Sequence, residues 1–225
     1  MGKDINNIFI TKKNFLQKKE INILMNDIYK VFTEKKNLKK KFTKINFLQN
    51  RSEFDKLYFD IKEKTNYWPK IYDNLDRIPS YKKIILQKIS FFIKKKFNKK
   101  IKIITKKFRV IEKNDKRSYP MHQEYPGIKS KSFLIFWVAL HKIKKSEGGL
   151  LLSKLKDNVP LIHKKNRMGY PILINQPKIK KNSFEKTFQP GELLILGKYI
   201  SHGTAKKLKG QPRWASLVRA KIIEN

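Results

Sequence analysis

The sequence predicts an α+β protein with a mainly β core in its second half and flanking helices in its first half. In residues 1–100, apolar residues recur every three or four positions, as in "EINILMNDIYKVF". After residue 100 the apolar runs become short, β-branched or aromatic, and Gly, Pro, Asn and Asp separate them, as in "FLIFWVAL" and "GELLILGKYI". This pattern is typical of a β sandwich or barrel with helices packed outside it.

Three helices are expected in the first hundred residues. One carries the stripe that begins at Ile21, one begins at Ser52 with Asp55 in the capping-box position, and one begins near "PSYKK". We interpret their apolar stripes as faces that pack on the core rather than as a groove for a partner.

The chain length favours a single domain over residues 1–225. At 225 residues and 26.9 kDa it can bury one sizeable core. We divide it into a helical flank over 1–100 and a β core over 101–225. Residues 154–186 lack clear periodicity and form a long connection, so they are predicted to be a lid over a site.

Cysteine is absent, which excludes disulfides, iron–sulfur clusters, cysteine-ligated zinc and thiol nucleophiles. A metal must therefore use His, Asp or Glu, and the four histidines are His122, His141, His163 and His202. No apolar run is long enough for a signal peptide or a membrane span, so we expect a cytoplasmic protein without a transmembrane segment.

The formal net charge of +36 leaves an anionic partner or substrate open. The excess is almost entirely lysine, which an AT-biased coding sequence would supply as a solvated coat. A nucleic acid, an anionic small molecule and a membrane surface all remain possible. The lysines are spread along the whole chain without an aromatic-interleaved RNA-binding signature, so nucleic acid is the less favoured partner.

The segment "MHQEYPG" contains the first candidate metal ligands. His122 and Glu124 have i, i+2 spacing, which on a strand points both side chains to one face. Alone, this pair fits an exposed polar strand better than a metal site. However, His202 follows 78 residues after Glu124, at the end of another expected strand. Two histidines and one carboxylate, with three positions left open, are the arrangement of non-haem iron(II) oxygenases.

An arginine follows the second histidine at a suitable distance. Arg213 lies eleven residues beyond His202 and opens the last expected strand. A guanidinium there could bind the far carboxylate of a 2-oxo acid with two parallel hydrogen bonds.

Four segments between about 108 and 222 together resemble the phytanoyl-CoA dioxygenase-like family of Fe(II)/2-oxoglutarate-dependent oxygenases. They are "MHQEYPG", "FLIFWVALHKIKKSEGGLLL", "QPGELLILGKYISHGT" and "QPRWASLVRAKI". The resemblance implies a double-stranded β-helix, or jelly roll, with iron(II) as cofactor, 2-oxoglutarate as co-substrate and O2 as oxidant.

The resemblance also implies roles for individual residues. The implied iron ligands are His122, Glu124 and His202. The residues implied for binding 2-oxoglutarate are Arg213, Thr204, Trp137 and Arg109. Arg109 fits equally well as a solvent-facing strand residue. His141 and His163 receive no metal role, because they fall at a strand end and in the expected lid.

The sequence departs from the family at Glu124, where aspartate is commoner. Glutamate is one methylene longer, so its oxygen must reach the metal through another rotamer or from a strand set further back. We expect iron binding to survive. A carboxylate at this position also argues against a halogenase, which needs the position vacated for halide.

The favoured function is an Fe(II)/2-oxoglutarate-dependent dioxygenase that hydroxylates a small, possibly anionic metabolite and releases succinate and CO2. A lipid, a sugar and a natural-product precursor all fit as substrate. Two alternatives stay open: a basic nucleic-acid-binding protein with an incidental H-x-E, and a cupin-like metalloprotein that is not an oxygenase. The sequence indicates neither the substrate nor the oligomeric state.

Overall fold

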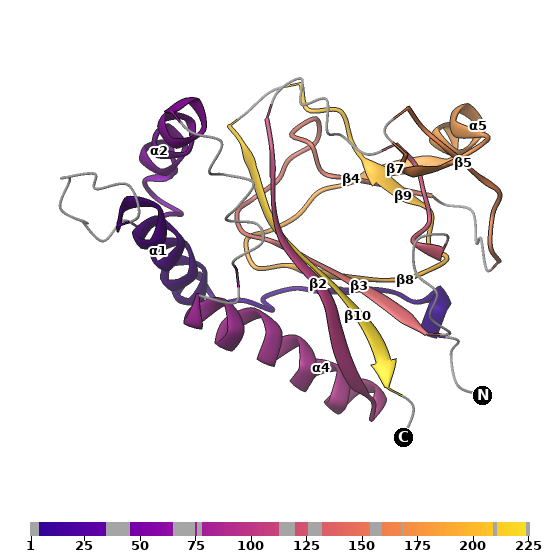
Figure 1. Cartoon of the computed structure of the whole chain (residues 1–225), viewed down its shortest axis with the longest axis horizontal. Helices are drawn as coiled ribbons and strands as arrows, with labels where there is room; N and C mark the ends of the chain where they lie inside the picture. Colours follow the sequence, from indigo (N-terminus) through magenta and orange to yellow (C-terminus); the bar gives the residue numbers. More distant parts are fainter. Residues whose placement is uncertain are drawn as a thin grey trace.

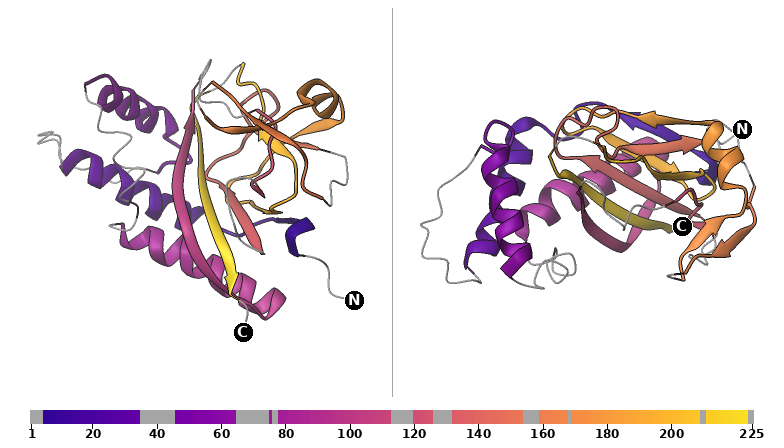
Figure 2. Two further views of the ribbon diagram at one scale, coloured as in Figure 1. Left: turned by 45° about the vertical axis from the view of Figure 1, so that its right-hand side comes forward. Right: turned by 90° about the horizontal axis from the view of Figure 1, so that it is seen from above.

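The fold combines a larger β-sheet, a smaller one and a layer of helices (Figure 1). A computed structural model describes residues 5–34, 46–64, 75, 78–112, 120–125, 132–153, 159–167, 169–208 and 211–223. The helices of the first hundred residues cover one side of the larger sheet, and the smaller sheet lies on the other side (Figure 2). The predicted β-rich α+β class is therefore confirmed.

The larger sheet contains five antiparallel strands. In spatial order they are β1 (Phe9–Lys12), β8 (Leu193–Gly197), β3 (Phe133–Ala139), β10 (Arg213–Ile223) and β2 (Lys100–Ile111). The central strand β3 is buried along its whole length. Its even-numbered residues, such as Phe136, pack against the helices, whereas its odd-numbered residues, such as Trp137, pack toward the smaller sheet. This double burial explains the uninterrupted apolar run "FLIFWVA".

The smaller sheet carries one of the candidate ligands. Its strands are β7 (Ser183–Lys186), β4 (Leu150–Ser153) and β9 (His202–Thr204). Leu150 and Leu152 of β4 join Trp137, Leu194 and Leu196 of the larger sheet in one apolar cluster. The inner faces of the two sheets therefore share a core, which holds the site between them.

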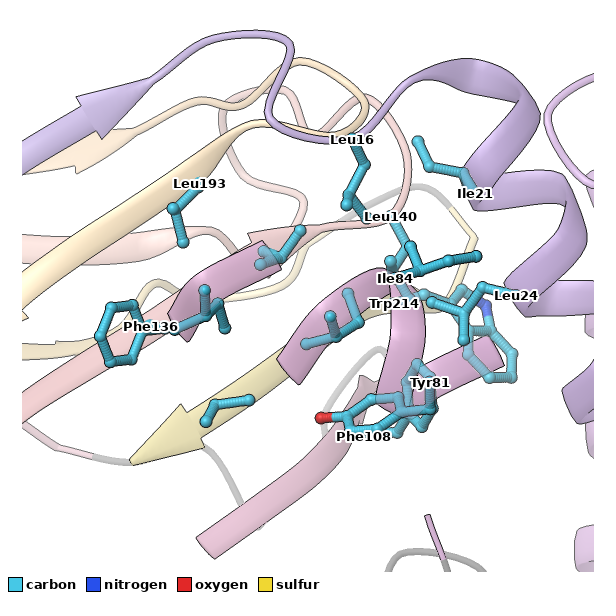
Figure 3. Packing of buried hydrophobic residues seen from close by; sticks show 14 of the residues in the cluster. Leu16, Ile21, Leu24, Tyr81, Ile84, Phe108, Phe136, Leu140, Leu193 and Trp214 are labelled. Carbon is cyan, nitrogen blue, oxygen red and sulfur yellow. The ribbon is translucent and has the colours of Figure 1, made fainter. Parts of the chain in front are cut away.

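Helical segments pack on the outer face of the larger sheet. They are η1 (Ile5–Asn7), α1 (Lys18–Glu34), α2 (Arg51–Lys64), the π-helical η3 (Tyr81–Gln87) and α4 (Lys88–Phe97). Figure 3 shows Leu24 of α1 beside Trp214 of β10, and Tyr81 of η3 beside Phe108 of β2, and Ile21 belongs to the same apolar cluster. The apolar stripes of the first half are thus core-packing faces, as predicted.

Two local expectations in the first half of the chain need correction. Phe9–Lys12, inside the expected helical flank, is a strand that pairs with the edge of β8. Asp55 does not act as a capping residue, because its Oδ1 accepts a hydrogen bond from the indole Nε1 of Trp214 at 2.8 Å. The expected lid has secondary structure of its own, while 154–158 and residue 168 lie outside the described residues.

The described part of the lid segment is a hairpin followed by a short helix. It contains β5 (His163–Lys165), β6 (Pro171–Leu173), α5 (Gln176–Lys181) and strand β7. None of the described helices is long and apolar enough to cross a membrane.

Candidate metal centre

The two candidate histidines lie directly opposite each other on paired backbone segments. The N–H of His122 donates to the carbonyl of His202 at 2.8 Å, and the N–H of His202 donates to the carbonyl of His122 at 2.9 Å. The imidazole centroids are 4.4 Å apart. The strand expected at His122–Glu124 is reduced to this single bridge, and Glu124 lies in a bend. The Glu124 side chain still joins the histidines, whereas that of Gln123 bonds to other backbone segments.

The three side chains converge on one point. The Oε1 atom of Glu124 lies 3.8 Å from Nε2 of His122 and 3.9 Å from Nε2 of His202. One potential ligand atom from each residue can be chosen so that all three lie within 4.8 Å of one another. These residues are therefore the group, within the described part of the chain, whose donor atoms are close enough to share one ion.

Backbone carbonyls fix the orientation of both imidazoles. Nδ1 of His122 lies 2.9 Å from the carbonyl of Pro120, and Nδ1 of His202 lies 2.9 Å from the carbonyl of Ile200. A carbonyl only accepts hydrogen bonds, so each Nδ1 carries the proton and donates. Each Nε2 is left with a lone pair toward Glu124, which is the state that a metal requires.

The charges around the site favour an ionised glutamate and a neutral histidine. Burial alone would raise the pKa of Glu124, but the neighbouring His122 and the charge of Arg219 lower this pKa well below its usual range. Burial and the nearby His122 lower the pKa of His202 to about 4. At neutral pH the site thus offers a carboxylate and an unprotonated imidazole.

A cavity beside the three residues collects the other predicted site residues. Its described lining includes Arg109, Trp137, Thr204 and Arg213. Arg213 is 2% exposed, and its Cζ lies 5.2 Å from the ring centroid of Trp137, within the range of a cation–π contact. The structure therefore brings all seven predicted site residues around one space.

Two further cationic side chains line the cavity, and neither was identified as a site residue from the sequence. Lys107 of β2 and Arg219 of β10 also line it. Nη2 and Nε of Arg219 donate to Oε1 of Glu124, at 2.6 and 3.0 Å. The spacing could have indicated Arg219, because it lies an even number of residues beyond Arg213 on the same strand and so shares its face.

Gln123, which lies between the two candidate ligands His122 and Glu124, connects them to the expected lid segment. The side-chain Nε2 of Gln123 donates to the carbonyls of Val159 and Tyr199, at 3.1 and 2.7 Å, and its Oε1 accepts from the N–H of Leu161 at 2.8 Å. The backbone N–H of Gln123 donates to Nε2 of His163 at 3.0 Å. His163 therefore acts as an acceptor for the backbone next to the candidate ligands.

The fourth histidine lies in a buried polar network at the start of β10. Nε2 of His141 accepts from the backbone N–H of Trp214 at 3.1 Å, and Arg51 contacts Nδ1 of the same ring at 2.8 Å. Burial and the charge of Arg51 lower the pKa of His141. Burial raises the pKa of Asp55 to about 6, although Trp214 and Arg51 oppose this shift. The network connects α2 to the strand that carries Arg213 and Arg219.

The donor set fits a divalent transition metal. Two imidazole nitrogens and one carboxylate oxygen on one side of an ion suit iron(II), and they leave further coordination positions free for other ligands. His122, Glu124 and His202 are the residues that could hold the ion, and Arg213, Thr204, Trp137 and Arg109 surround the adjoining space.

Comparisons with known proteins find the fold but no sequence family. No protein-family model matches the sequence, and no curated protein matches it. EctD from S. alaskensis, solved with 2-oxoglutarate and 5-hydroxyectoine, has a TM-score of 0.59 and 9% identity, and the match covers 95% of this chain and 71% of that one.

Two other similar structures are matched over smaller parts. SnoK, a non-heme alpha ketoglutarate dependent carbocyclase from nogalamycin biosynthesis, has a TM-score of 0.53 and 13% identity over 65% of this chain and 61% of that one. EvdO2 from Micromonospora carbonacea var. aurantiaca has a TM-score of 0.52 and 14% identity over 71% of this chain and 65% of that one. The chain thus spans slightly less than two thirds of EvdO2 and of SnoK. At these identities the likeness shows a shared fold.

Proposed function

We propose that this protein is an Fe(II)/2-oxoglutarate-dependent dioxygenase of the phytanoyl-CoA dioxygenase-like branch, which hydroxylates a small metabolite. The facing pair His122 and His202, each with its Nε2 directed toward Oε1 of Glu124, carries this proposal. In this assignment the two sheets are the two halves of a jelly roll. The fold shared with EctD and SnoK supports it.

The ligand residues are prepared for a metal before it binds. Pro120 and Ile200 hold the Nδ1 protons through their carbonyls, so neither imidazole has to change tautomer. Arg219 holds the carboxylate of Glu124 on the side that faces the histidines. The conformational entropy of these three side chains is therefore lost on folding and not on metal binding.

The co-substrate site is built around Arg213. Its guanidinium can form two parallel hydrogen bonds with a carboxylate, and the Trp137 ring beneath it limits its movement. Thr204 and Arg109 line the same cavity and can share that carboxylate. In this proposal these four residues bind and orient 2-oxoglutarate.

The apolar lining completes the site. Ile135, Leu150 and Leu196 border the cavity, where they exclude water and surround the hydrocarbon part of a substrate. Bound iron(II) would supply the activation of O2, coupled to the conversion of 2-oxoglutarate to succinate and CO2. The protein's own contribution is binding, orientation and the exclusion of water.

The test measures succinate formation and 2-oxoglutarate binding separately. Purified protein given iron(II), ascorbate and 2-oxoglutarate should form succinate slowly without substrate. Arg213→Ala should abolish this turnover and weaken 2-oxoglutarate binding to the nickel-loaded protein by about a hundredfold or more, because a buried charge-assisted pair is lost. Calorimetry provides the binding readout.

Arg167→Ala is the matched control, because it removes an exposed arginine of the described chain outside the cavity. It should leave both measurements unchanged. A nucleic-acid-binding protein or a cupin-like metalloprotein would be insensitive to Arg213→Ala. Absence of metal binding, or of 2-oxoglutarate consumption with every candidate substrate, would exclude the proposed function.

A further inference from the structure

Strands β2 and β10 contribute four cations to the wall of the cavity. Each cation comes from a different pair of opposite residues, and these pairs, here called levels, follow one another every second residue along β10. In order along β10 these cations are Arg213, Arg109, Lys107 and Arg219. The antiparallel register places Lys107 opposite Leu217, which lies between the levels of Arg109 and Arg219. Diagonal neighbours on one face of such a pair are about 7–8 Å apart, so long side chains from adjacent levels can reach a common ligand.

The cavity has more positive charge than the proposed cofactor and co-substrate require. Its described lining contains those four cations and a single carboxylate, Glu124. Arg219 and Glu124 form an ion pair at 2.6 Å, which leaves a surplus of three positive charges. Iron(II) would add two positive charges and 2-oxoglutarate two negative ones, so their binding leaves the surplus unchanged. In a partly enclosed space this surplus attracts a further anion.

Lys107 is the cation of the described lining to which the proposed function assigns no role. Arg213 and the adjacent Arg109 face the proposed co-substrate, and Arg219 holds Glu124. Lys107 is half-buried at the cavity wall, and no acidic side chain in the described part of the chain pairs with it. We propose that Lys107 anchors an oxyanion subsite, and that the molecule to be oxidised carries a carboxylate, sulfonate or phosphate group.

This inference rests on the proposed function and specifies its substrate class. An ammonium group has three donors and a compact charge, which suit an oxyanion of any shape. Leu150 and Leu196 border the same cavity, so an apolar body attached to the oxyanion would also find contacts there. The favoured substrate is therefore a small acid with an aliphatic or similarly apolar body.

The experiment measures oxyanion binding while the other anion position is blocked. Protein loaded with nickel(II) and N-oxalylglycine, an unreactive analogue of 2-oxoglutarate, is titrated with sulfate and separately with acetate by calorimetry. The analogue occupies Arg213 and two of the three open metal positions, and the comparison of Lys107→Gln with Lys102→Gln separates binding at the subsite from binding at the remaining metal position. We expect at least one probe to bind, with Lys107→Gln weakening it about tenfold. Lys102→Gln removes the same charge from an exposed position of β2 and should have no effect.

Each result has a distinct meaning. Binding of sulfate alone assigns a phosphate or sulfonate, and binding of acetate assigns a carboxylate. Failure of both probes to bind, or equal affinities in Lys107→Gln and Lys102→Gln, overturns the subsite while leaving the oxygenase assignment in place. Failure of nickel or N-oxalylglycine to bind in the loading step contradicts the proposed function itself.

Discussion

Arg219 donates two hydrogen bonds to the same oxygen of Glu124, Oε1, from Nη2 at 2.6 Å and from Nε at 3.0 Å. The same Oε1 atom lies 3.8 Å from Nε2 of His122. A glutamate has one more torsion than an aspartate, and therefore more ways to turn its carboxylate away from a metal. The two hydrogen bonds from the guanidinium restrict that freedom and keep the carboxylate directed toward the histidines.

Replacing Arg219 by lysine tests whether this orientation matters. Lysine keeps the positive charge, so the repulsion between this side chain and a metal ion stays similar, but the two-donor fork is lost. We therefore expect Arg219→Lys to weaken nickel(II) or cobalt(II) binding by about 10-fold to 100-fold. A competitive titration against a chromophoric chelator measures the affinity. Arg167→Lys, an exposed change of the same kind, should leave it unaltered, and unchanged binding by Arg219→Lys would remove the orienting role.

Shortening the side chain of the proposed ligand Glu124 should also lower the affinity for a metal ion. Glu124→Asp withdraws the oxygens by about one carbon–carbon bond, roughly 1.5 Å, from both Arg219 and the histidines. We expect about a tenfold loss of affinity in the same titration, even though aspartate is the commoner ligand in the resembling family. Combined with Arg219→Lys, the loss should be smaller than the sum of the two free-energy changes, because both remove one contact. Wild-type affinity in Glu124→Asp would show that the backbone adapts.

The residues of the candidate metal centre could be singled out in the sequence because their signal is local or depends on strand order. The i, i+2 spacing of His122 and Glu124 is a local signal that predicted a shared direction. The structure has an isolated bridge and a bend there instead of a strand, so the pairing with His202 also contributes to their approach. Arg213 opens the last strand, as predicted, whereas His202 does not end a strand as expected, because β8 stops at Gly197 and His202 is the first residue of β9. The sequence could not show that His122 and His202 pair directly, since that depends on how two distant segments meet.

Other features depend on packing and left little trace in the sequence. The strand Phe9–Lys12 has only four residues, mostly exposed, and exists because it pairs with β8. The three-residue strands β5 and β6 are too short to show a period of two. The role of Lys107 depends on the register between β2 and β10, and one more lysine in a chain with 54 Lys and Arg is not conspicuous.

Gln123 should determine the stability of the lid segment. It is fully buried, and Gln123→Leu would leave the carbonyls of Val159 and Tyr199 and the N–H of Leu161 without this partner. Unpaired buried backbone groups cost about 1–3 kcal/mol each, so we expect a loss of about 2–4 kcal/mol, with incomplete additivity. Urea unfolding measures the loss, and hydrogen exchange should accelerate first at Leu161.

The control for this substitution is Gln189→Leu, which changes an exposed glutamine and should alter stability by less than about 0.5 kcal/mol. If Gln123→Leu unfolds with the same midpoint as this control and exchanges at the wild-type rate, Gln123 does not fasten the lid segment.

The carboxyl group of Asp55 should make stability depend on pH in a recognisable direction. Burial raises the pKa of Asp55 from 3.8 to about 6 in the folded protein. Between these two values the folded state holds the proton more tightly than the unfolded chain. The favourable contribution of Asp55 is therefore complete below about pH 4 and is lost as the pH rises through about 6.

Asp55→Asn removes this titration while keeping a carbonyl oxygen for the indole N–H of Trp214. We expect the unfolding free energy of the wild type, relative to that of the variant, to fall by about 2–3 kcal/mol between pH 4 and pH 7, since one pKa unit corresponds to about 1.4 kcal/mol. Urea unfolding at four or five pH values gives this difference directly. Asp60→Asn removes an exposed carboxylate of the same helix and controls for the loss of one charge. A difference between wild type and Asp55→Asn that stays constant with pH would mean that Asp55 ionises normally and that burial does not control its charge.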